Sequence, residues 1–150
     1  MPVDITAATL ADLPALCSLL NALFTQEAEF QPDEAAQRRG LTRIITQPDV
    51  GLIVVAREGG QVRGMVNLLY TVSTALGERV AWLEDMVVAP THRGTGLGQQ
   101  LLQGAIKLAR AQGCRRITLL TDGDNVAARR FYEREGFSVS GMVPYRLALD

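Results

Sequence analysis

The sequence predicts an α/β fold in which a mixed β-sheet has helices on both of its faces. Two observations carry this prediction. Short apolar segments typical of strands occur between longer segments whose apolar residues repeat with helical spacing. Glycine and proline mark most of the boundaries between these segments. The expected order is β-α-α-β-β-β-α-β-α-β-β, and a length of 150 residues fits a single domain, residues 1–150.

The first half of the chain begins with an alternating segment, followed by two amphipathic helices. Thr9 or Asp12 can cap the first helix, and Gln47-Pro48-Asp49 ends the second, because a residue before proline avoids helical geometry. Glu58-Gly59-Gly60-Gln61 is typical of a hairpin turn. The elements expected here are a strand over 3–7, a helix that includes Leu13 to Phe24, a helix from Pro32-Asp33, and strands over 52–57 and 62–72.

The second half alternates strands and helices and ends in two strands. Pro90 stops the first of these strands, and Gly113 and Gly136 are typical of the residue that ends a helix. The elements expected here are a strand over 80–89, a helix from Gly96 to Gly113, a strand over 116–120, a helix from Asn125 to Gly136, and strands over 137–139 and 142–149.

The composition is that of an ordinary globular protein, with 47% hydrophobic and 21% charged residues. A net charge of −1 argues against a nucleic-acid surface, and no apolar run reaches the length of a membrane span. Cys17 and Cys114 lack the spacing of a metal or redox site, and the first four residues lack the features of a signal peptide. We therefore expect a cytoplasmic protein with no metal and with neither nucleic acid nor membrane as a partner.

The most informative segment is Arg93-Gly94-Thr95-Gly96-Leu97-Gly98, which lies between an expected strand and an expected helix. A helix N-terminus has unpaired N–H groups and a partial positive charge, and glycine lets a ligand approach the backbone. The segment therefore predicts a phosphate-binding loop. Gly98 is followed by Gln99-Gln100, unlike a Walker P-loop, and the spacing G-x-G-x-G differs from the dinucleotide pattern G-x-G-x-x-G.

Arg93-x-x-Gly96-x-Gly98 instead matches the pattern (Gln/Arg)-x-x-Gly-x-(Gly/Ala) and resembles the pyrophosphate loop of the GNAT superfamily of acyl-CoA-dependent N-acyltransferases. Downstream, residues 125–137 are similar to that family's N-x-x-A-x-x-F-Y-x-x-x-G-F helix. Leu83-Glu84-Asp85 resembles a segment of polyamine- and diamine-type members. The resemblance is strongest from Leu83 to Phe137. It implies a mostly antiparallel central sheet and acetyl-CoA as co-substrate.

The resemblance also implies which residues hold acetyl-CoA. The backbone of the loop binds the pyrophosphate. The strand before the loop separates from its neighbour, and its freed backbone pairs with the pantetheine amides and polarises the thioester carbonyl. The residues expected to bind acetyl-CoA are Met86, Val87, Val88, Arg93, Gly94, Thr95, Gly96, Leu97, Gly98, Gln99, Asn125 and Ala128.

Acyl transfer to an amine needs a base for the amine proton, and a proton donor helps the thiolate to leave. Tyr132 is the expected acid, because a phenol is neutral at pH 7 and the matching family position commonly has this role. Glu84 is the expected base, directly or through water; the alternatives are Asp85 as base and a purely structural pairing of the carboxylate. Strand alternation puts these two carboxylates on opposite faces, so only one is expected to face the acetyl group. The only histidine, His92, is interpreted as loop packing or a contact at the rim of the site.

The acceptor is the part that the sequence defines least. The family builds the acceptor pocket from the first two helices, their connection and the region of the second and third strands. Here Glu27 and Glu29 could attract a cationic amine, and Phe24 and Phe30 could line its apolar part; an exposed acidic loop is the alternative. The expected function is acetyl transfer to a primary amine of a small molecule, by direct attack in a ternary complex. A lysine or N-terminal protein acetyltransferase and a non-catalytic acyl-CoA-binding regulatory module stay open, as do the acyl-chain preference and a homodimer.

Overall fold

The computed structural model describes residues 2–26 and 33–149. The chain divides into two compact units, one from Met1 to Leu120 and one from Thr121 to Asp150. The single-domain organisation stays a prediction. None of the described helices is long and apolar enough to cross a membrane.

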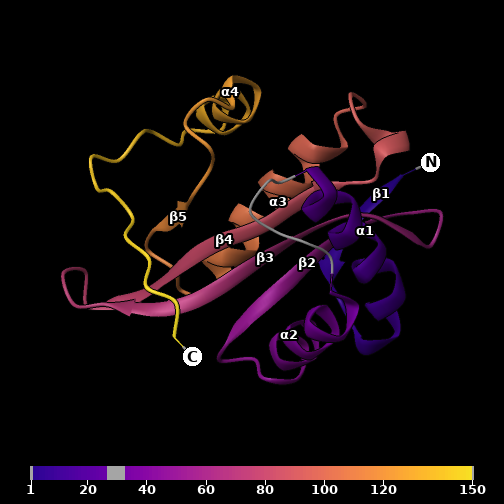
Figure 1. Cartoon of the computed structure of the whole chain (residues 1–150), viewed down its shortest axis with the longest axis horizontal. Coiled ribbons are helices and arrows are strands. Elements are labelled where there is room, and N and C mark those ends of the chain that lie inside the picture. The colour runs from indigo at the N-terminus through magenta and orange to yellow at the C-terminus, as the bar shows by residue number, and fades with distance from the viewer. Residues whose placement is uncertain (1, 27–32, 150) are drawn as a thin grey trace. The chain divides into compact units, whose positions relative to one another are not determined.

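The first unit is built on a five-stranded sheet with the strand order β1-β2-β3-β4-β5. Strands β1 to β4 pair antiparallel with their neighbours, and β4 and β5 pair in parallel. Figure 1 shows the long strands β2, β3 and β4 side by side. The strands are β1 (Val3–Ala7), β2 (Gly51–Glu58), β3 (Gln61–Ser73), β4 (Glu78–Val88) and β5 (Ile117–Leu119). The predicted mixed, mostly antiparallel sheet is therefore confirmed.

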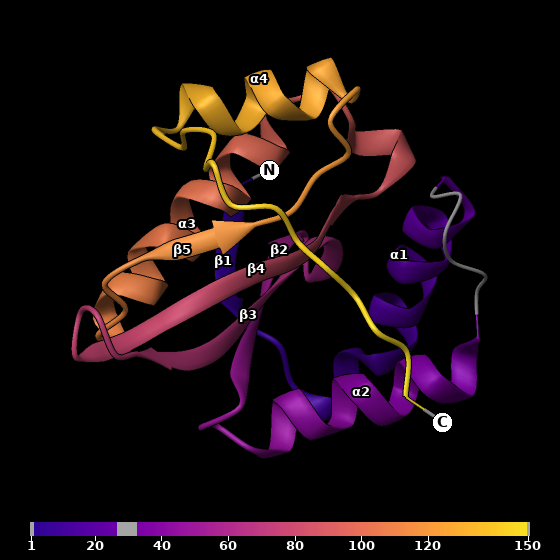
Figure 2. The ribbon, with the colours of Figure 1, turned by 60° about the vertical axis from the view of Figure 1, so that its left-hand side comes forward.

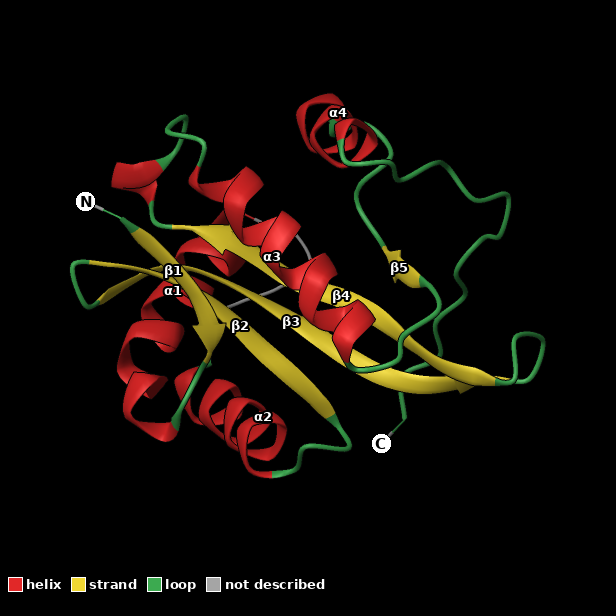
Figure 3. Cartoon of the chain, turned by 180° about the vertical axis from the view of Figure 1, so that it is seen from behind, coloured by secondary structure: helices red, strands yellow, loops and turns green. Residues whose placement is uncertain are grey.

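Helices cover both faces of this sheet, as the sequence predicts. Figure 2 shows α1 and α2 on one face and α3 on the other, and Figure 3 shows α3 lying across the strands on the near side. The helices are α1 (Leu13–Gln26), α2 (Glu34–Thr46) and α3 (Leu97–Ala111), with two 3-10 turns, η1 (Leu10–Asp12) and η2 (Pro90–His92). Asp33 begins α2 by accepting a hydrogen bond of 3.1 Å from the backbone N–H of Ala36.

Apolar side chains hold the helices to the sheet. On the face of α1 and α2, a buried cluster joins helix residues to strand residues; its members are Leu16, Cys17, Leu19, Leu20, Leu41, Ile53, Val55, Met65 and Val87. On the face of α3, Leu101, Leu102 and Ala105 are fully buried. Burial of each large apolar side chain stabilises the fold by about 1.5–3 kcal/mol, so these layers fix the position of β4 within the sheet.

The second unit has one helix among its described residues, α4 (Val126–Arg134). Asn125 caps it, because its side-chain oxygen accepts a hydrogen bond of 3.1 Å from the N–H of Ala128. The strands expected over 137–139 and 142–149 do not form in the described residues. Apolar patterning alone suggested them, but a strand also needs a hydrogen-bonded neighbour, and this segment pairs with none of the described strands.

Candidate active site

The loop between β4 and α3 has the geometry of an anion-binding site. Gly94 and Gly96 have φ angles of 75° and 85°, in the left-handed region that glycine adopts without strain. Gly96 is the N-cap of α3, and a Cβ added at either glycine would have no described atom within 4 Å. The first turn of α3 has N–H groups that the helix itself does not pair. An anion can therefore approach this helix start without meeting a side chain.

Side chains fix the turn that leads into this loop. His92 Nε2 lies 3.3 Å from Glu58 Oε1 at the end of β2, and His92 Nδ1 lies 2.9 Å from Thr91 Oγ1. The hydroxyl of Thr95 donates to the carbonyl oxygen of His92 at 2.6 Å. Both ring nitrogens of His92 thus have partners within the protein, which supports the interpretation of this residue as loop packing.

Strand β4 has a β-bulge just before the loop. Asn67 of β3 pairs with Glu84 and Met65 pairs with Val87, so β4 has one residue more than β3 between these two pairs. The extra length falls at Asp85, whose φ of 55° makes it the one described non-glycine residue with a positive φ. A side chain in the left-handed region costs about 1–2 kcal/mol, so the surrounding contacts must hold Asp85 in this conformation.

A buried side chain provides such a contact. Asn67 is 3% exposed, and its Nδ2 donates to Asp85 Oδ2 at 2.7 Å. Because Asn67 is the cross-strand partner of Glu84, its side chain lies on the Glu84 face of the sheet and still reaches Asp85. The expected placement of Glu84 and Asp85 on opposite faces therefore does not hold, because the bulge interrupts the alternation of the strand.

Glu84 itself is exposed on β4. No hydrogen bond or ion pair joins its side chain to another residue in the part of the chain that the structure describes. The structure therefore shows this carboxylate exposed and without structural pairing among the described residues. An exposed carboxylate without a cation partner can accept a proton from a bound ammonium group or from water.

The side of β4 that faces β5 is open beyond Leu83. The parallel ladder joins Ala81–Leu83 to Ile117–Leu119 and ends there. Along Glu84–Val88, no described strand pairs with this edge of β4. The family resemblance implies a separation of the two strands before the loop, which stays a prediction. The unpaired N–H and C=O groups of such an edge can hydrogen-bond the amides of an extended ligand.

In the second unit, Tyr132 of α4 contacts two other aromatic rings. The ring centroids of Phe131 and Phe137 lie 5.2 and 5.7 Å from that of Tyr132, both in edge-on geometry. The N–H of Phe137 also donates to the carbonyl oxygen of Tyr132 at 3.2 Å. Burial raises the pKa of the Tyr132 phenol to about 12. The phenol is therefore protonated at neutral pH, as a proton donor must be.

Comparison with known proteins decides the family. The sequence pattern of the acetyltransferase (GNAT) family matches residues 13–137. The chain belongs to the GNAT family. This family uses acetyl-CoA as its co-substrate, and the chain is an N-acetyltransferase.

Relatives of this acetyltransferase cover nearly its whole length. It is 30% identical to an uncharacterized N-acetyltransferase of Bacillus subtilis, YhfO, over 97% of both chains. It is 31% identical to the aminoalkylphosphonate N-acetyltransferase of Salmonella typhimurium, over 93% of this chain and 88% of the relative. It is 29% identical to an L-methionine sulfoximine/L-methionine sulfone acetyltransferase of Pseudomonas aeruginosa, over 96% of this chain and 85% of the relative.

Solved structures show the same fold. A possible acetyltransferase from Clostridium difficile superposes on this acetyltransferase with a TM-score of 0.90, at 15% identity, over 100% of this chain and 99% of the other. A protein from the mobile metagenome of Cole Harbour Salt Marsh superposes with a TM-score of 0.84, at 29% identity, over 97% of this chain and 90% of the other.

The acceptor side of the acetyltransferase is described only in part. Glu27, Glu29 and Phe30 lie outside the described residues. Phe24 is half-buried on α1 and packs against the apolar cluster, so part of its surface already belongs to the core. The described residues contain no group of three or more histidine, cysteine, aspartate or glutamate side chains that could hold a metal ion.

Two polar features of the acetyltransferase have only weak signals in its sequence. Asn67 interrupts an apolar run, and this was the available sign of a buried polar contact. Asp12 suggests only a helix cap, yet it accepts hydrogen bonds of 2.9 and 2.6 Å from the guanidinium of Arg57, 45 residues away. Neither partner could be identified from local spacing, because both contacts depend on how the strands align.

Proposed function

We propose that this acetyltransferase transfers the acetyl group of acetyl-CoA to the primary amine of a small molecule, by direct attack within a ternary complex. One observation carries the proposal. Residues 84–98 contain, in order, an exposed carboxylate, an open strand edge and an anion-binding helix start. These three features support the assignment of a base, of a place for an extended amide chain and of a place for a pyrophosphate.

The cofactor follows this segment. The pyrophosphate binds the N–H groups from Gly94 to Gln99, and Arg93 adds a forked cation. The pantetheine amides pair with the open edge of β4 at Met86, Val87 and Val88. Asn125 and Ala128 are assigned to the pantetheine arm by the family motif; in the described structure they already bond to each other as the cap of α4.

The reaction then needs three proton transfers: two from the nitrogen of the acceptor and one to the thiolate. Glu84 takes a proton from the ammonium of the acceptor, directly or through water. The amine nitrogen forms a bond to the thioester carbon, and a backbone N–H of the β4 edge stabilises the negative charge on the carbonyl oxygen. The carbon–sulfur bond breaks and Tyr132 gives its proton to the departing thiolate. The nitrogen, which still carries one proton more than an amide, returns that proton to the Tyr132 phenolate directly or through water, and this leaves an acetamide and CoA. Glu84 releases its own proton to solvent.

The acceptor class is supported by the relatives. The Salmonella relative is named for aminoalkylphosphonates, and the Pseudomonas relative for methionine sulfoximine and sulfone. Each of these compounds is a small primary amine that also carries a tetrahedral oxygen-bearing phosphorus or sulfur group. We therefore include this chemistry, as well as small diamines, in the acceptor class to be tested.

The test is an acceptor screen with acetyl-CoA in which release of free thiol is measured. The panel contains an aminoalkylphosphonate, methionine sulfone, a diamine, a peptide with a lysine and a free N-terminus, and a blank without acceptor. Turnover with one or more small amines, well above the blank, is expected. Turnover confined to the peptide would replace the proposal with a protein acetyltransferase, and turnover equal to the blank throughout would refute it.

A further inference from the structure

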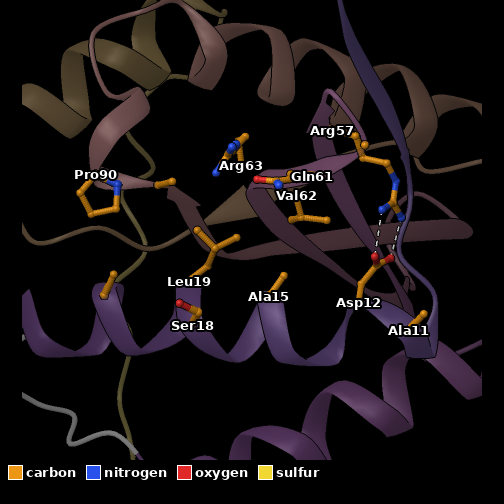
Figure 4. Close-up of a pocket in the computed structure, with 13 residues that line it drawn as sticks. Ala11, Asp12, Ala15, Ser18, Leu19, Arg57, Gln61, Val62, Arg63 and Pro90 are labelled. Atoms are coloured by element: carbon orange, nitrogen blue, oxygen red, sulfur yellow. Dashed lines mark hydrogen bonds and ion pairs between the residues drawn. The ribbon is translucent and has the colours of Figure 1, made fainter.

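A pocket of about 570 Å³ lies in the first unit, between α1, the hairpin that joins β2 to β3, and the end of β4 (Figure 4). Its lining contains no residue of the loop from Arg93 to Gln99, and it does not include Glu84. None of the residues assigned above to acetyl-CoA, to the acid or to the base lines this pocket.

The pocket exists because one side of α1 carries small side chains. Ala15, Ser18 and Ala22 of α1 follow one another at intervals of three and four residues, and Ala11 of the preceding turn η1 lies four residues before Ala15; all four line the pocket. Residues at this spacing lie on one side of a helix. Larger side chains there would reach the hairpin and fill the space. Leu19 of α1, Val62 of β3 and Pro90 add apolar wall.

One of the two arginines in the lining is already neutralised. Arg57 forms a two-pronged ion pair with Asp12, with distances of 2.9 and 2.6 Å, and Figure 4 shows this pair at one end of the pocket. Asp12 is 8% exposed. The pair therefore forms a rigid wall with no net charge.

Arg63 is different, because none of the described carboxylates forms an ion pair with it. Its Nε is buried and has no hydrogen-bond partner among the described residues. Arg63 lines the pocket together with Gln61, across from Ser18 and Leu19 of α1 (Figure 4). A buried donor without a partner is costly, and this cost is removed when an anion accepts its hydrogen bond.

We infer that this pocket is a second ligand site, which binds a small carboxylate with a short aliphatic body. The lining has one uncompensated positive charge, which a single carboxylate balances. The forked guanidinium of Arg63 matches the two oxygens of a carboxylate. Gln61 and Ser18 supply further hydrogen bonds, and Leu19, Val62 and Pro90 contact the hydrocarbon part.

The test is a titration of the full-length, ¹⁵N-labelled chain with sodium butyrate, followed by amide NMR shifts at constant ionic strength. Saturable shifts are expected along the hairpin and the pocket side of α1, with a dissociation constant on the order of millimolar for so small a ligand. Arg63→Met, which keeps the aliphatic stem, should weaken binding by about tenfold or more. Arg39→Met is the matched control, because Arg39 is exposed on α2 outside the pocket.

A second variant, Ala15→Leu, fills the pocket without changing its charge and should also weaken butyrate binding. The amide NMR spectrum of Ala15→Leu shows whether this variant is folded. The inference can therefore be tested with Ala15→Leu if Arg63→Met is unstable. The inference is overturned if the wild-type chain shows no saturable shifts, or if butylammonium binds equally well. It is also overturned if Arg63→Met binds butyrate as the wild type does. Loss of butyrate binding by competition with CoA would make the pocket part of the cofactor site and would equally overturn it.

Discussion

At the scale of single residues, Asp85 shows how a local backbone conformation can prepare a strand for chemistry. Its positive φ of 55° places the bulge between Glu84, the proposed base, and Met86, the start of the proposed pantetheine contact. The only buried polar residue of the adjacent part of β3, Asn67, donates to Asp85 and leaves its own Oδ1 without a described partner. A buried acceptor without a partner lowers the stability of the fold, so stability does not explain an asparagine at this position. The role that the structure supports for Asn67 is its hydrogen bond to Asp85.

The first prediction tests this contact through Asn67→Leu, which keeps the size of the side chain and removes its donor. Turnover should fall by about tenfold or more, because the β4 amide that stabilises the oxyanion is no longer held in place. The free energy of unfolding should change little, since the unpaired Oδ1 is removed together with the hydrogen bond. Asp85→Asn is the control, because asparagine tolerates the left-handed conformation and keeps an acceptor for Asn67. Wild-type turnover in Asn67→Leu would contradict the prediction.

The second prediction concerns Tyr132, whose pKa of about 12 lies above the usual value for a phenol. The phenol of Tyr132 loses its proton only as pH rises toward 12. Deprotonation of Tyr132 should therefore cause no fall in kcat up to about pH 10. Tyr132→Phe should lower kcat by roughly ten- to a thousandfold with little change in acetyl-CoA affinity. The measurement is a kcat profile for both proteins under conditions where chemistry limits the rate. Full turnover in the phenylalanine variant would leave Tyr132 only a packing role.

The third prediction separates Glu84 from Asp85 as base. Glu84→Gln keeps the size and removes the carboxylate. The kcat/KM of this variant for the acceptor should fall furthest below that of the wild type at low pH, where the amine is mostly ammonium. The difference should shrink as the pH approaches the amine pKa of about 10. Asp85→Asn should give a profile parallel to that of the wild type. The opposite pattern, with the pH-dependent loss in Asp85→Asn, would assign the base to Asp85.

At the scale of elements, the β4–α3 connection combines a strand edge with a helix start. Gly96, the N-cap of α3, has no side chain that would keep a phosphate away from the backbone. The fourth prediction is that Gly96→Val lowers CoA affinity by about tenfold to a hundredfold, the loss of one or two charge-assisted hydrogen bonds. Gly113→Val is a matched control, because Gly113 has a φ of 83° against 85° for Gly96 and is equally open to space. Both variants carry the same backbone strain, so calorimetry should show the loss of affinity in Gly96→Val alone.

The elements also show how far local sequence information reaches. The segment expected as a strand over 62–72 is β3 (Gln61–Ser73), and the helix expected from Gly96 to Gly113 is α3 (Leu97–Ala111). Periodicity and end residues are local signals, so these elements were predictable. The bulge at Asp85 depends on the register between β3 and β4, and the open edge of β4 depends on where β5 stops pairing. Neither has a local signal in the sequence. The strands expected after residue 136 failed for the same reason, since strand formation depends on a partner.

At the scale of the whole molecule, the ion pair between Asp12 and Arg57 joins the turn that precedes α1 to β2. It is a long-range contact between residues 45 apart in sequence, and Asp12 is 8% exposed. The hydrogen bonds from Arg57 lower the pKa of Asp12 below its usual value, and they outweigh the opposing effect of burial. A carboxylate with a lowered pKa binds fewer protons in the folded state than in the unfolded state. Its contribution to stability is therefore present above the unfolded pKa and is lost as pH falls through the folded one.

The fifth prediction follows from this direction of the pH dependence of stability. Asp12→Asn keeps the shape and can still accept from the N–H of Thr9, but it leaves Arg57 without its counter-charge. The free energy of unfolding at pH 7, measured with urea, should fall by about 2 kcal/mol, as for a hydrogen-bonded charge with its partner removed. The difference from wild type should shrink as pH falls below about 4, where the unfolded aspartate takes up its proton. Asp49→Asn is the control, because the Asp49 carboxylate is fully exposed and lies 3.9 Å from Arg79, so its loss should be too small to measure. If the free energy of unfolding of Asp12→Asn stays below that of the wild type by the same amount down to pH 3, the pair stabilises the fold by packing and not by charge.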